Sequence, residues 1–235
     1  MTALIETRGL AVGYGSRAVV SGLALHVEPG EVVSLFGPNG AGKTTTLLTL
    51  AGALAPISGQ VVLFGDVASS PLHMRVRQGL AFITDERSMI SKLTARDNLR
   101  LRGGSVDRAL EIFPELEDHL DRPAALLSGG QQQMLAVARS LASQPRLLLA
   151  DELSLGLAPL LVQRLLKAVR AAADQGVGVL LVEQHVAQAL AISDRAYLLG
   201  QGTVAMEGSA ESLKERLDDV AAAYLKGHPA SHHPA

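Results

Sequence analysis

Residues 37–44 read GPNGAGKT, three glycines set among residues that end in a lysine and a threonine. Glycine allows backbone conformations that turn successive N–H groups toward one point, where they can hold an anion. The stretch follows the apolar run VVSLF and opens the helix-like run KTTTLLTLAG, so a helix amino terminus adds partial positive charge at the same place. This context predicts a phosphate-binding loop rather than an ordinary glycine-rich turn.

Two side chains of this loop have specific expected tasks. Lys43 is expected to reach the outer phosphates of a nucleotide, and the Thr44 hydroxyl is a suitable ligand for Mg²⁺. The candidate nucleotide-binding set is Gly37, Pro38, Asn39, Gly40, Ala41, Gly42, Lys43, Thr44 and Thr45.

Two adjacent carboxylates, Asp151 and Glu152, stand directly after the apolar run RLLLA. Neighbouring acids at the end of a buried strand repel each other and lose water, which is unfavourable without a compensating cation. A Mg²⁺ ion held at the phosphate loop would compensate, with Asp151 as a ligand. Glu152 could then polarise a water molecule for in-line attack on the terminal phosphate. Such a pair alone indicates only a strand exit, but together with the loop it predicts hydrolysis.

The stretch LLSGGQQQ, residues 126–133, predicts a helix start, because Ser128 and Gln131 have the spacing of a capping box. Gly129 and Gly130 disfavour the first turn of that helix. Without side chains they expose backbone N–H groups, which would make a second anion site. The alternative is a plain capped helix with glycines in its entry loop. Beside a phosphate loop, a second anion site suggests a nucleotide held between two copies.

Short apolar runs separated by helical patterns predict the elements that position these motifs. Continuous runs of this length suggest strands buried on both faces of a parallel sheet, and the helices follow Gly42, Ser128 and Pro159. The fold class is therefore α/β. The runs are 32–36, 61–64, 80–83, 146–150, 177–182 and 196–199.

Two further regions complete the expected organisation. Turn signals around short alternating runs in the first 30 or so residues suggest an antiparallel β element. Short helical patterns in residues 88–127 suggest a small helical insertion. We expect one domain over 1–226, with a helical part at about 88–145, and a disordered tail at 227–235.

Composition excludes several other classes of protein. The formal net charge of −2 over 235 residues gives no electrostatic footprint for nucleic acid. There is no cysteine, so disulfides and thiolate metal sites are excluded. The apolar runs are far shorter than the about 20 residues that span a bilayer. Any membrane role is therefore expected to come through a partner.

Taken together, the motifs GPNGAGKT, LSGGQ, the strand ending in Asp151 and Glu152, and SLGLAP resemble the nucleotide-binding domain of ATP-binding cassette (ABC) proteins. The resemblance runs from Tyr14 to about Leu225. It implies a P-loop ATPase fold that uses ATP and Mg²⁺. It also implies a head-to-tail dimer in which each ATP lies between one subunit's phosphate loop and the other's LSGGQ. The family pattern implies that adenine stacks on Tyr14 and that residues 154–157 meet the partner subunit. It also implies that the ATP bound to the partner subunit contacts the signature residues Ser128, Gly129, Gly130 and Gln131.

Within this family, LSGGQQQMLAVARSL, DELSLGLAP and VLLVEQHV most resemble the LivF-type ATP-binding subunits of branched-chain amino acid importers. The implied partners are a second ATP-binding subunit (sister or copy), transmembrane permease subunits docked near 85–105 and, indirectly, a periplasmic or extracellular substrate-binding protein. The implied location is the cytoplasmic face of the cell membrane. Related subunits for urea, short amides or lipopolysaccharide export share much of this pattern.

Three positions depart from the general family pattern. The family usually has a Mg²⁺-contacting glutamine at the position of Asp85, and Glu86 is an alternative ligand. A histidine usually contacts the γ-phosphate at the position of Gln184, so we expect Gln184 to take that role, with His185 as the alternative after a shift of one residue. Leu153 replaces the usual proline. These departures leave open a degenerate module that binds ATP without turnover, whereas a non-transport protein with tandem cassettes is disfavoured by the single cassette.

Overall fold

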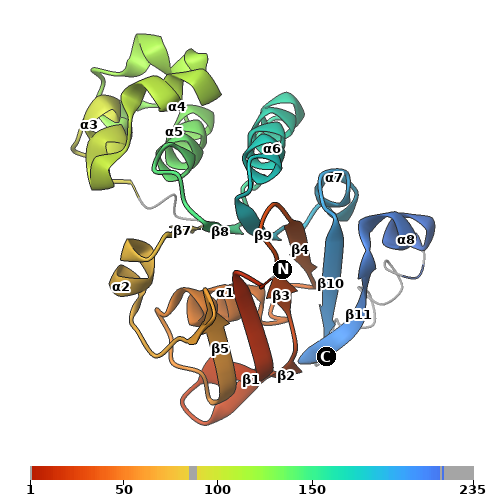
Figure 1. Ribbon diagram of the computed structural model, residues 1–235. Coiled ribbons are helices and arrows are strands. Elements are labelled where there is room, and N and C mark those ends of the chain that lie inside the picture. Colours follow the sequence, from red (N-terminus) through yellow and green to blue (C-terminus); the bar gives the residue numbers. More distant parts are fainter. Residues whose placement is uncertain (1, 85–88, 218, 220–235) are drawn as a thin grey trace, which may run out of the picture.

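A computed structural model describes residues 2–84, 89–217 and 219 of the chain. Its larger sheet has six strands in the order β11-β10-β4-β9-β8-β7 (Figure 1). The five strands from β10 to β7 run parallel, and β11 pairs antiparallel with β10. The strands are β4 (Val32–Phe36), β7 (Leu80–Ile83), β8 (Leu147–Asp151), β9 (Gly178–Val182), β10 (Arg195–Gly200) and β11 (Thr203–Ser209).

The second sheet is antiparallel and contains the first strands of the chain. Its order is β2-β1-β5-β6, and β3 also pairs with β1. The prediction that the apolar run 61–64 forms a strand of the parallel sheet is wrong, because β5 pairs antiparallel with β1 and β6. An apolar run reports burial but not the direction of the neighbouring strand. The strands are β1 (Ile5–Tyr14), β2 (Arg17–Leu23), β3 (His26–Val27), β5 (Ser58–Leu63) and β6 (Asp66–Val67).

Helix α1 (Lys43–Ala51) lies between the two sheets. Its Leu47 and Leu50 side chains are fully buried in a core that also contains residues of β1, β4, β8 and β9. The carboxyl end of α1 is capped by Arg75 of α2 (Leu72–Arg77), which is buried and donates to the carbonyl oxygens of Thr49 and Leu50. A cation is favourable at this end of a helix dipole. The helix that begins at the phosphate loop is therefore anchored at its carboxyl end.

Helices cover the other face of the larger sheet, around Phe36, Leu148 and Leu181. Helices α3, α4 and α5 form a group beside β7 and β8, at the upper left in Figure 1, and α6 lies next to it. None of the helices in the described ranges is both long and apolar enough to cross a bilayer. The helices are α3 (Ala95–Arg100), η1 (Leu101–Gly103), α4 (Val106–Ile112), η2 (Pro114–His119), η3 (Ala124–Leu126), α5 (Gly129–Ala142), α6 (Pro159–Asp174), α7 (Val186–Leu190) and α8 (Ala210–Glu215).

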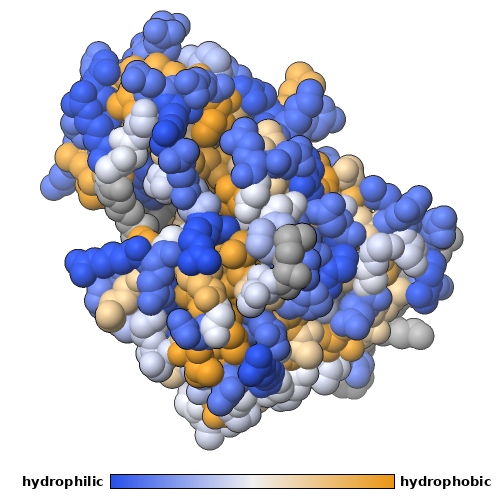
Figure 2. All heavy atoms as spheres, viewed as in Figure 1, coloured by the Kyte–Doolittle hydropathy of each residue, from blue (hydrophilic) through white to orange (hydrophobic). Residues whose placement is uncertain are grey.

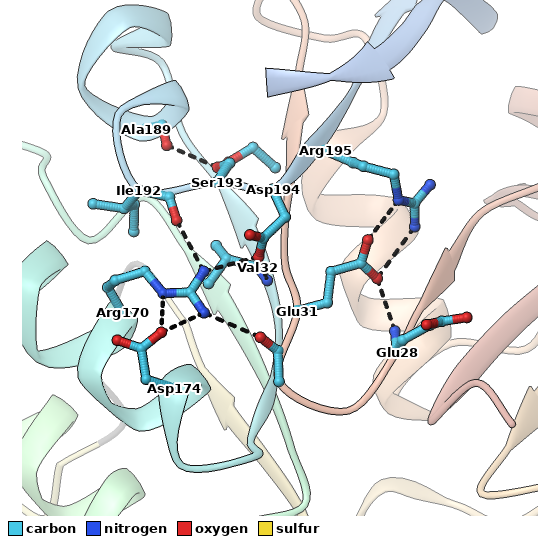
Figure 3. Close-up of polar contacts among 12 residues, drawn as sticks. Glu28, Glu31, Val32, Arg170, Asp174, Ala189, Ile192, Ser193, Asp194 and Arg195 are labelled. Carbon is cyan, nitrogen blue, oxygen red and sulfur yellow. Dashed lines mark hydrogen bonds and ion pairs between the residues drawn. The ribbon is translucent and has the colours of Figure 1, made fainter. Parts of the chain in front are cut away.

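A network of ion pairs closes the amino-terminal edge of the larger sheet (Figure 3). Arg170 of α6 contacts the carboxylates of Asp174 and Asp194 at 2.8 Å each, and also donates to two backbone carbonyls. Arg195 at the start of β10 pairs with Glu31, which precedes β4. These contacts tie α6 to the beginnings of β4 and β10, at the end of the sheet away from the phosphate loop.

Candidate functional site

The predicted phosphate-loop and catalytic residues come together at the carboxyl ends of three adjacent parallel strands. The phosphate loop follows β4, Gln184 follows β9, and Glu152 follows Asp151, the last residue of β8. Ligands of open α/β sheets bind outside this edge. A cavity of about 470 Å³ lies there. It is lined by Val19, Asn39, Gly40, Gly42, Lys43, Thr44, Thr45, Asp151, Glu152 and Gln184.

The phosphate loop requires glycine at the residue that begins α1. Gly42 is the N-cap and has a left-handed conformation with φ of 92°. A Cβ atom there would lie 2.5 Å from Val20 Cγ2, so a larger residue would be both strained and too close to β2. This contact also brings the β1–β2 hairpin to the cavity, where Val19 is a lining residue that the sequence did not indicate.

Lys43 is a buried cation held beside the cavity. Its Nζ donates to the carbonyl oxygens of Gly37 at 2.8 Å and Pro38 at 3.2 Å. Burial lowers the pKa of Lys43, while the nearby negative charges of Glu152 and Asp151 oppose that shift. A phosphate would offer Nζ charged acceptors in place of these neutral carbonyls, and such hydrogen bonds are stronger.

Glu152, the residue directly after β8, has an uncommon backbone conformation. Its φ is 49°, in the left-handed region, and its N–H donates to the carbonyl of Val182 at 2.9 Å. Left-handed non-glycine residues are strained and concentrate at functional sites. The Glu152 Oε1 atom accepts a hydrogen bond of 2.8 Å from Gln184 Nε2. The predicted base and the predicted γ-phosphate contact therefore touch each other.

A second cross-link joins the same two strand ends, and the sequence did not indicate it. Glu183 is buried, and its carboxylate accepts hydrogen bonds from the backbone N–H of Ser154 at 3.1 Å and from the Ser154 hydroxyl at 2.5 Å. Burial raises the pKa of Glu183, and the bonds from Ser154 lower it in part. Together with the Glu152 contacts, these bonds hold residues 152–154 against residues 182–184.

The donor atoms beside the cavity suit Mg²⁺. The Thr44 hydroxyl and the Asp151 carboxylate are hard oxygen ligands, and both residues line the cavity. Within the described ranges, no three acidic or histidine residues cluster to hold a metal by themselves. Mg²⁺ fits this arrangement, because it is typically held by one or two protein ligands together with phosphates and water. When bound it neutralises phosphate charge. Asp85 and Glu86, the other predicted ligands, lie outside the described residues.

Other predicted residues lie away from the cavity. Tyr14 ends β1 with 59% of its surface exposed and is not a lining residue. His185 is exposed at the start of α7, one residue beyond Gln184. Within this single chain, Gln184 lines the cavity and His185 does not. The side chain that contacts Glu152 is thus Gln184, at the position where the family usually has a histidine, and not His185.

The LSGGQ segment also lies outside this cavity, at the start of α5. The predicted capping box is present: the Ser128 hydroxyl accepts from the Gln131 N–H at 3.3 Å, and Gln131 Oε1 accepts from the Ser128 N–H at 2.9 Å. Gly130 has a packing role in addition, because a Cβ atom there would lie 2.4 Å from Leu161 Cδ2 of α6. The first turn of α5 therefore lies against the first turn of α6.

This arrangement can bind a nucleoside triphosphate and position a water molecule. Backbone N–H groups and Lys43 would hold the phosphates, and Glu152 lines the same cavity, where it could orient a water molecule. Gln184 would donate a hydrogen bond but no charge.

Comparison with known proteins agrees with this chemistry. The ABC transporter family model matches residues 20–154. The chain is 38% identical over 224 residues to the high-affinity branched-chain amino acid transport ATP-binding protein BraG of Pseudomonas aeruginosa, covering 91% of this chain and 96% of BraG. It is 35% identical over 219 residues to the lipopolysaccharide export system ATP-binding protein LptB of Escherichia coli K12, covering 88% and 91%.

A solved structure of an ATP-binding subunit of an ABC transporter superposes with a TM-score of 0.83 and 28% identity, over 95% of this chain and 100% of that one. Both the sequence match and the superposition thus extend over nearly the whole chain. The α/β fold predicted from the sequence is confirmed by this likeness. The chain belongs to the ABC transporter family and is an ATP-binding subunit that hydrolyses ATP.

Proposed function

We propose that this subunit powers the import of branched-chain or related amino acids by hydrolysing Mg-ATP in the cavity at the carboxyl edge of the larger sheet. Lys43 would hold the outer phosphates, Glu152 would activate the attacking water, and Gln184 would contact the γ-phosphate. The observation that supports these catalytic roles is the hydrogen bond from Gln184 to Glu152, which joins two segments distant in sequence in the cavity that the phosphate loop also lines.

The working site is proposed to need a second ATP-binding subunit. The LSGGQ segment is outside the chain's own cavity, so its N–H groups can serve only a nucleotide bound to another subunit. Leu126, directly before this segment, is 74% exposed, and Leu155, within the residues 154–157 expected to meet the partner, is 56% exposed, as expected of surfaces that a partner covers. That partner is a second copy or a sister subunit.

The permease is proposed to dock in a groove of about 450 Å³ between α1, α2 and the helical group, where Figure 2 shows a hollow. The groove is mostly apolar, and two of its lining residues, Ile90 and Leu101, lie within the predicted docking region near 85–105. It is lined by Leu48, Ala53, Leu72, Val76, Phe82, Thr84, Ile90, Leu101 and Arg139. Docking there would place the subunit on the cytoplasmic face of the membrane, with a substrate-binding protein acting on the far side.

Amino acid transport is favoured because BraG, whose name states branched-chain amino acid transport, matches at higher identity and coverage than LptB. Lipopolysaccharide export is the second candidate, favoured by LptB. Cells lacking this chain separate the two. Loss of labelled leucine uptake, restored by the wild-type chain but not by Glu152→Gln, supports import. Normal leucine uptake with reduced surface lipopolysaccharide supports export instead.

The catalytic proposal is tested by Mg-ATP turnover of the purified chain over a range of protein concentrations. We expect specific activity to rise with concentration, since the composite site forms only when two subunits meet, and Glu152→Gln to abolish it. Activity that is independent of concentration would contradict the composite site. Unchanged activity of Glu152→Gln would contradict the assigned base.

A further inference from the structure

The side chain of Gln131, in the first turn of α5, makes a hydrogen bond beyond its capping box. Its Nε2 atom lies 2.7 Å from His119 Nε2, at the end of η2. Its Oε1 atom accepts from the Ser128 N–H at 2.9 Å. The two ends of one amide therefore connect the LSGGQ segment to an imidazole that precedes it by 12 residues in the chain.

The chemistry of these groups determines which atom donates. A backbone N–H only donates, so the amide oxygen of Gln131 must face Ser128. The amide NH₂ then faces the ring and also only donates, which makes His119 Nε2 the acceptor. The imidazole must therefore be neutral, with its proton on Nδ1.

The surroundings of the other ring nitrogen, Nδ1, do not favour this tautomer. His119 Nδ1 is buried and, within the described part of the chain, has no hydrogen-bond partner. A buried N–H without a partner is an exception in folded proteins and asks for an explanation. The opposite tautomer would place a second donor against the Gln131 amide. Among the residues that the structure describes, the only polar contact of the imidazole is thus the bond that orients Gln131.

We propose that His119 is a positioning residue for the ATP-contacting LSGGQ segment. The capping box alone is enough to begin α5, since Ser128 and Gln131 satisfy each other. What His119 adds is a fixed amide: its acceptor prevents Gln131 from rotating its oxygen toward the first N–H groups of α5, where it would compete with a phosphate. This inference rests on the proposed function, because the phosphate belongs to the nucleotide of the second subunit.

The test uses two inactive variants that complement each other. Lys43→Ala lacks a working phosphate loop but keeps its LSGGQ segment. Gly129→Asp keeps its loop but places a carboxylate against the partner's phosphate, and an acid in the first turn of a helix does not weaken the helix. Neither alone should turn over Mg-ATP, whereas their mixture should contain one working site, built from the loop of one and the LSGGQ segment of the other.

We expect His119→Leu to lower turnover of the mixture about threefold to tenfold when it is carried by the Lys43→Ala copy. The same change on the Gly129→Asp copy should have no effect, because that copy's LSGGQ segment is already disabled. His119→Gln on the Lys43→Ala copy should restore turnover, since its Oε1 can take the place of Nε2. Equal losses on both copies would show a general effect on folding and overturn the proposal, as would no loss on either.

A spectroscopic measurement tests the expected tautomer of His119 without measuring turnover. In ¹⁵N NMR of the isolated chain at a pH where histidines are neutral, we expect His119 Nδ1 to carry the proton and Nε2 to be unprotonated. Gln131→Met removes the donor that faces Nε2, so the proton should be able to move to Nε2. A proton on Nε2 in the wild-type chain would overturn the inference. A silent mixture with the expected tautomer would instead place the failure in the proposed pairing of two copies.

Discussion

The two edges of the larger sheet carry charged residues in opposite ways. At the amino-terminal edge, Arg170 and Arg195 are paired with carboxylates of the same chain (Figure 3). At the carboxyl edge, Lys43 is more deeply buried, yet its hydrogen bonds go to two neutral carbonyls. Glu152 accepts from a neutral amide and has a strained backbone.

The difference separates structural charges from functional ones. Ion pairs complete within the chain need no ligand, and they join α6 to the beginnings of two strands. Lys43 and Glu152 are held in place by hydrogen bonds with neutral groups, so charge-assisted hydrogen bonds to a ligand would be stronger than those they make now. Changes at the first edge should therefore alter stability, and changes at the second should alter nucleotide chemistry.

The largest expected effect is on catalysis at the carboxyl edge. Glu152→Gln should lower Mg-ATP turnover by about a hundredfold or more, because it removes the proposed general base while its amide can still bond to Gln184. The melting temperature should change little. Asp174→Asn at the opposite edge is the matched control and should retain turnover. A similar loss in both variants would break the comparison.

At the amino-terminal edge, Arg170→Met should lower the free energy of unfolding by about 1–3 kcal/mol, since it removes the hydrogen bonds that Arg170 donates to two carboxylates and two carbonyls. Urea denaturation measures this. The control is Arg8→Met, which breaks an exposed pair with Glu6 and should lower stability much less, because solvent screens exposed ion pairs. Equal effects would mean that the network in Figure 3 contributes no more than a surface ion pair.

The buried carboxyl group of Glu183 predicts a pH dependence. Burial raises its pKa above the ordinary 4.5, so the folded chain keeps this proton at pH values where the unfolded chain has lost it. Its contribution to stability is complete below about pH 4.5 and is lost as the pH rises through the raised pKa. Glu183→Gln should therefore flatten the fall of melting temperature as the pH rises above about 4.5. Glu207→Gln on β11 should not, and an identical slope in wild type and Glu183→Gln would refute the assignment.

The smallest expected effect concerns the predicted adenine contact. Tyr14→Ala should weaken Mg-ATP binding about fivefold to tenfold, the lower range for loss of a stacked base, without changing stability. Tyr14→Phe keeps the ring and should bind normally. Titration with a fluorescent ATP analogue compares the three chains. Unchanged binding by Tyr14→Ala would remove this residue from the site.

The sequence predicted the features that local patterns carry. The glycines and lysine of residues 37–44, the acids after RLLLA and the capping box at Ser128 each have a characteristic spacing, and α1, β8 and α5 begin or end where those motifs indicate. The parallel strand run at 61–64 was misassigned, because direction depends on the partner strand.

Pairings between distant segments could not be predicted. Glu183 and Ser154 meet only because β8 and β9 are neighbours, and 29 residues separate them in the chain. His119 and Gln131 meet through the fold of the helical group. A histidine and a glutamine 12 residues apart do not form a recognisable sequence motif. Val19 reaches the cavity through a hairpin of the other sheet. Each contact depends on packing and leaves no mark in residue spacing.

The most direct test of the division between the two edges is the shift in melting temperature on adding Mg-ATP to the wild type, Lys43→Ala and Arg170→Met. A ligand at a hundred times its Kd stabilises a folded chain by about 2.7 kcal/mol. We expect the wild type and Arg170→Met to rise by the same amount, from different starting temperatures, and Lys43→Ala not to rise. A normal rise in Lys43→Ala, or its loss in Arg170→Met, would contradict the assignment of nucleotide binding to the carboxyl edge.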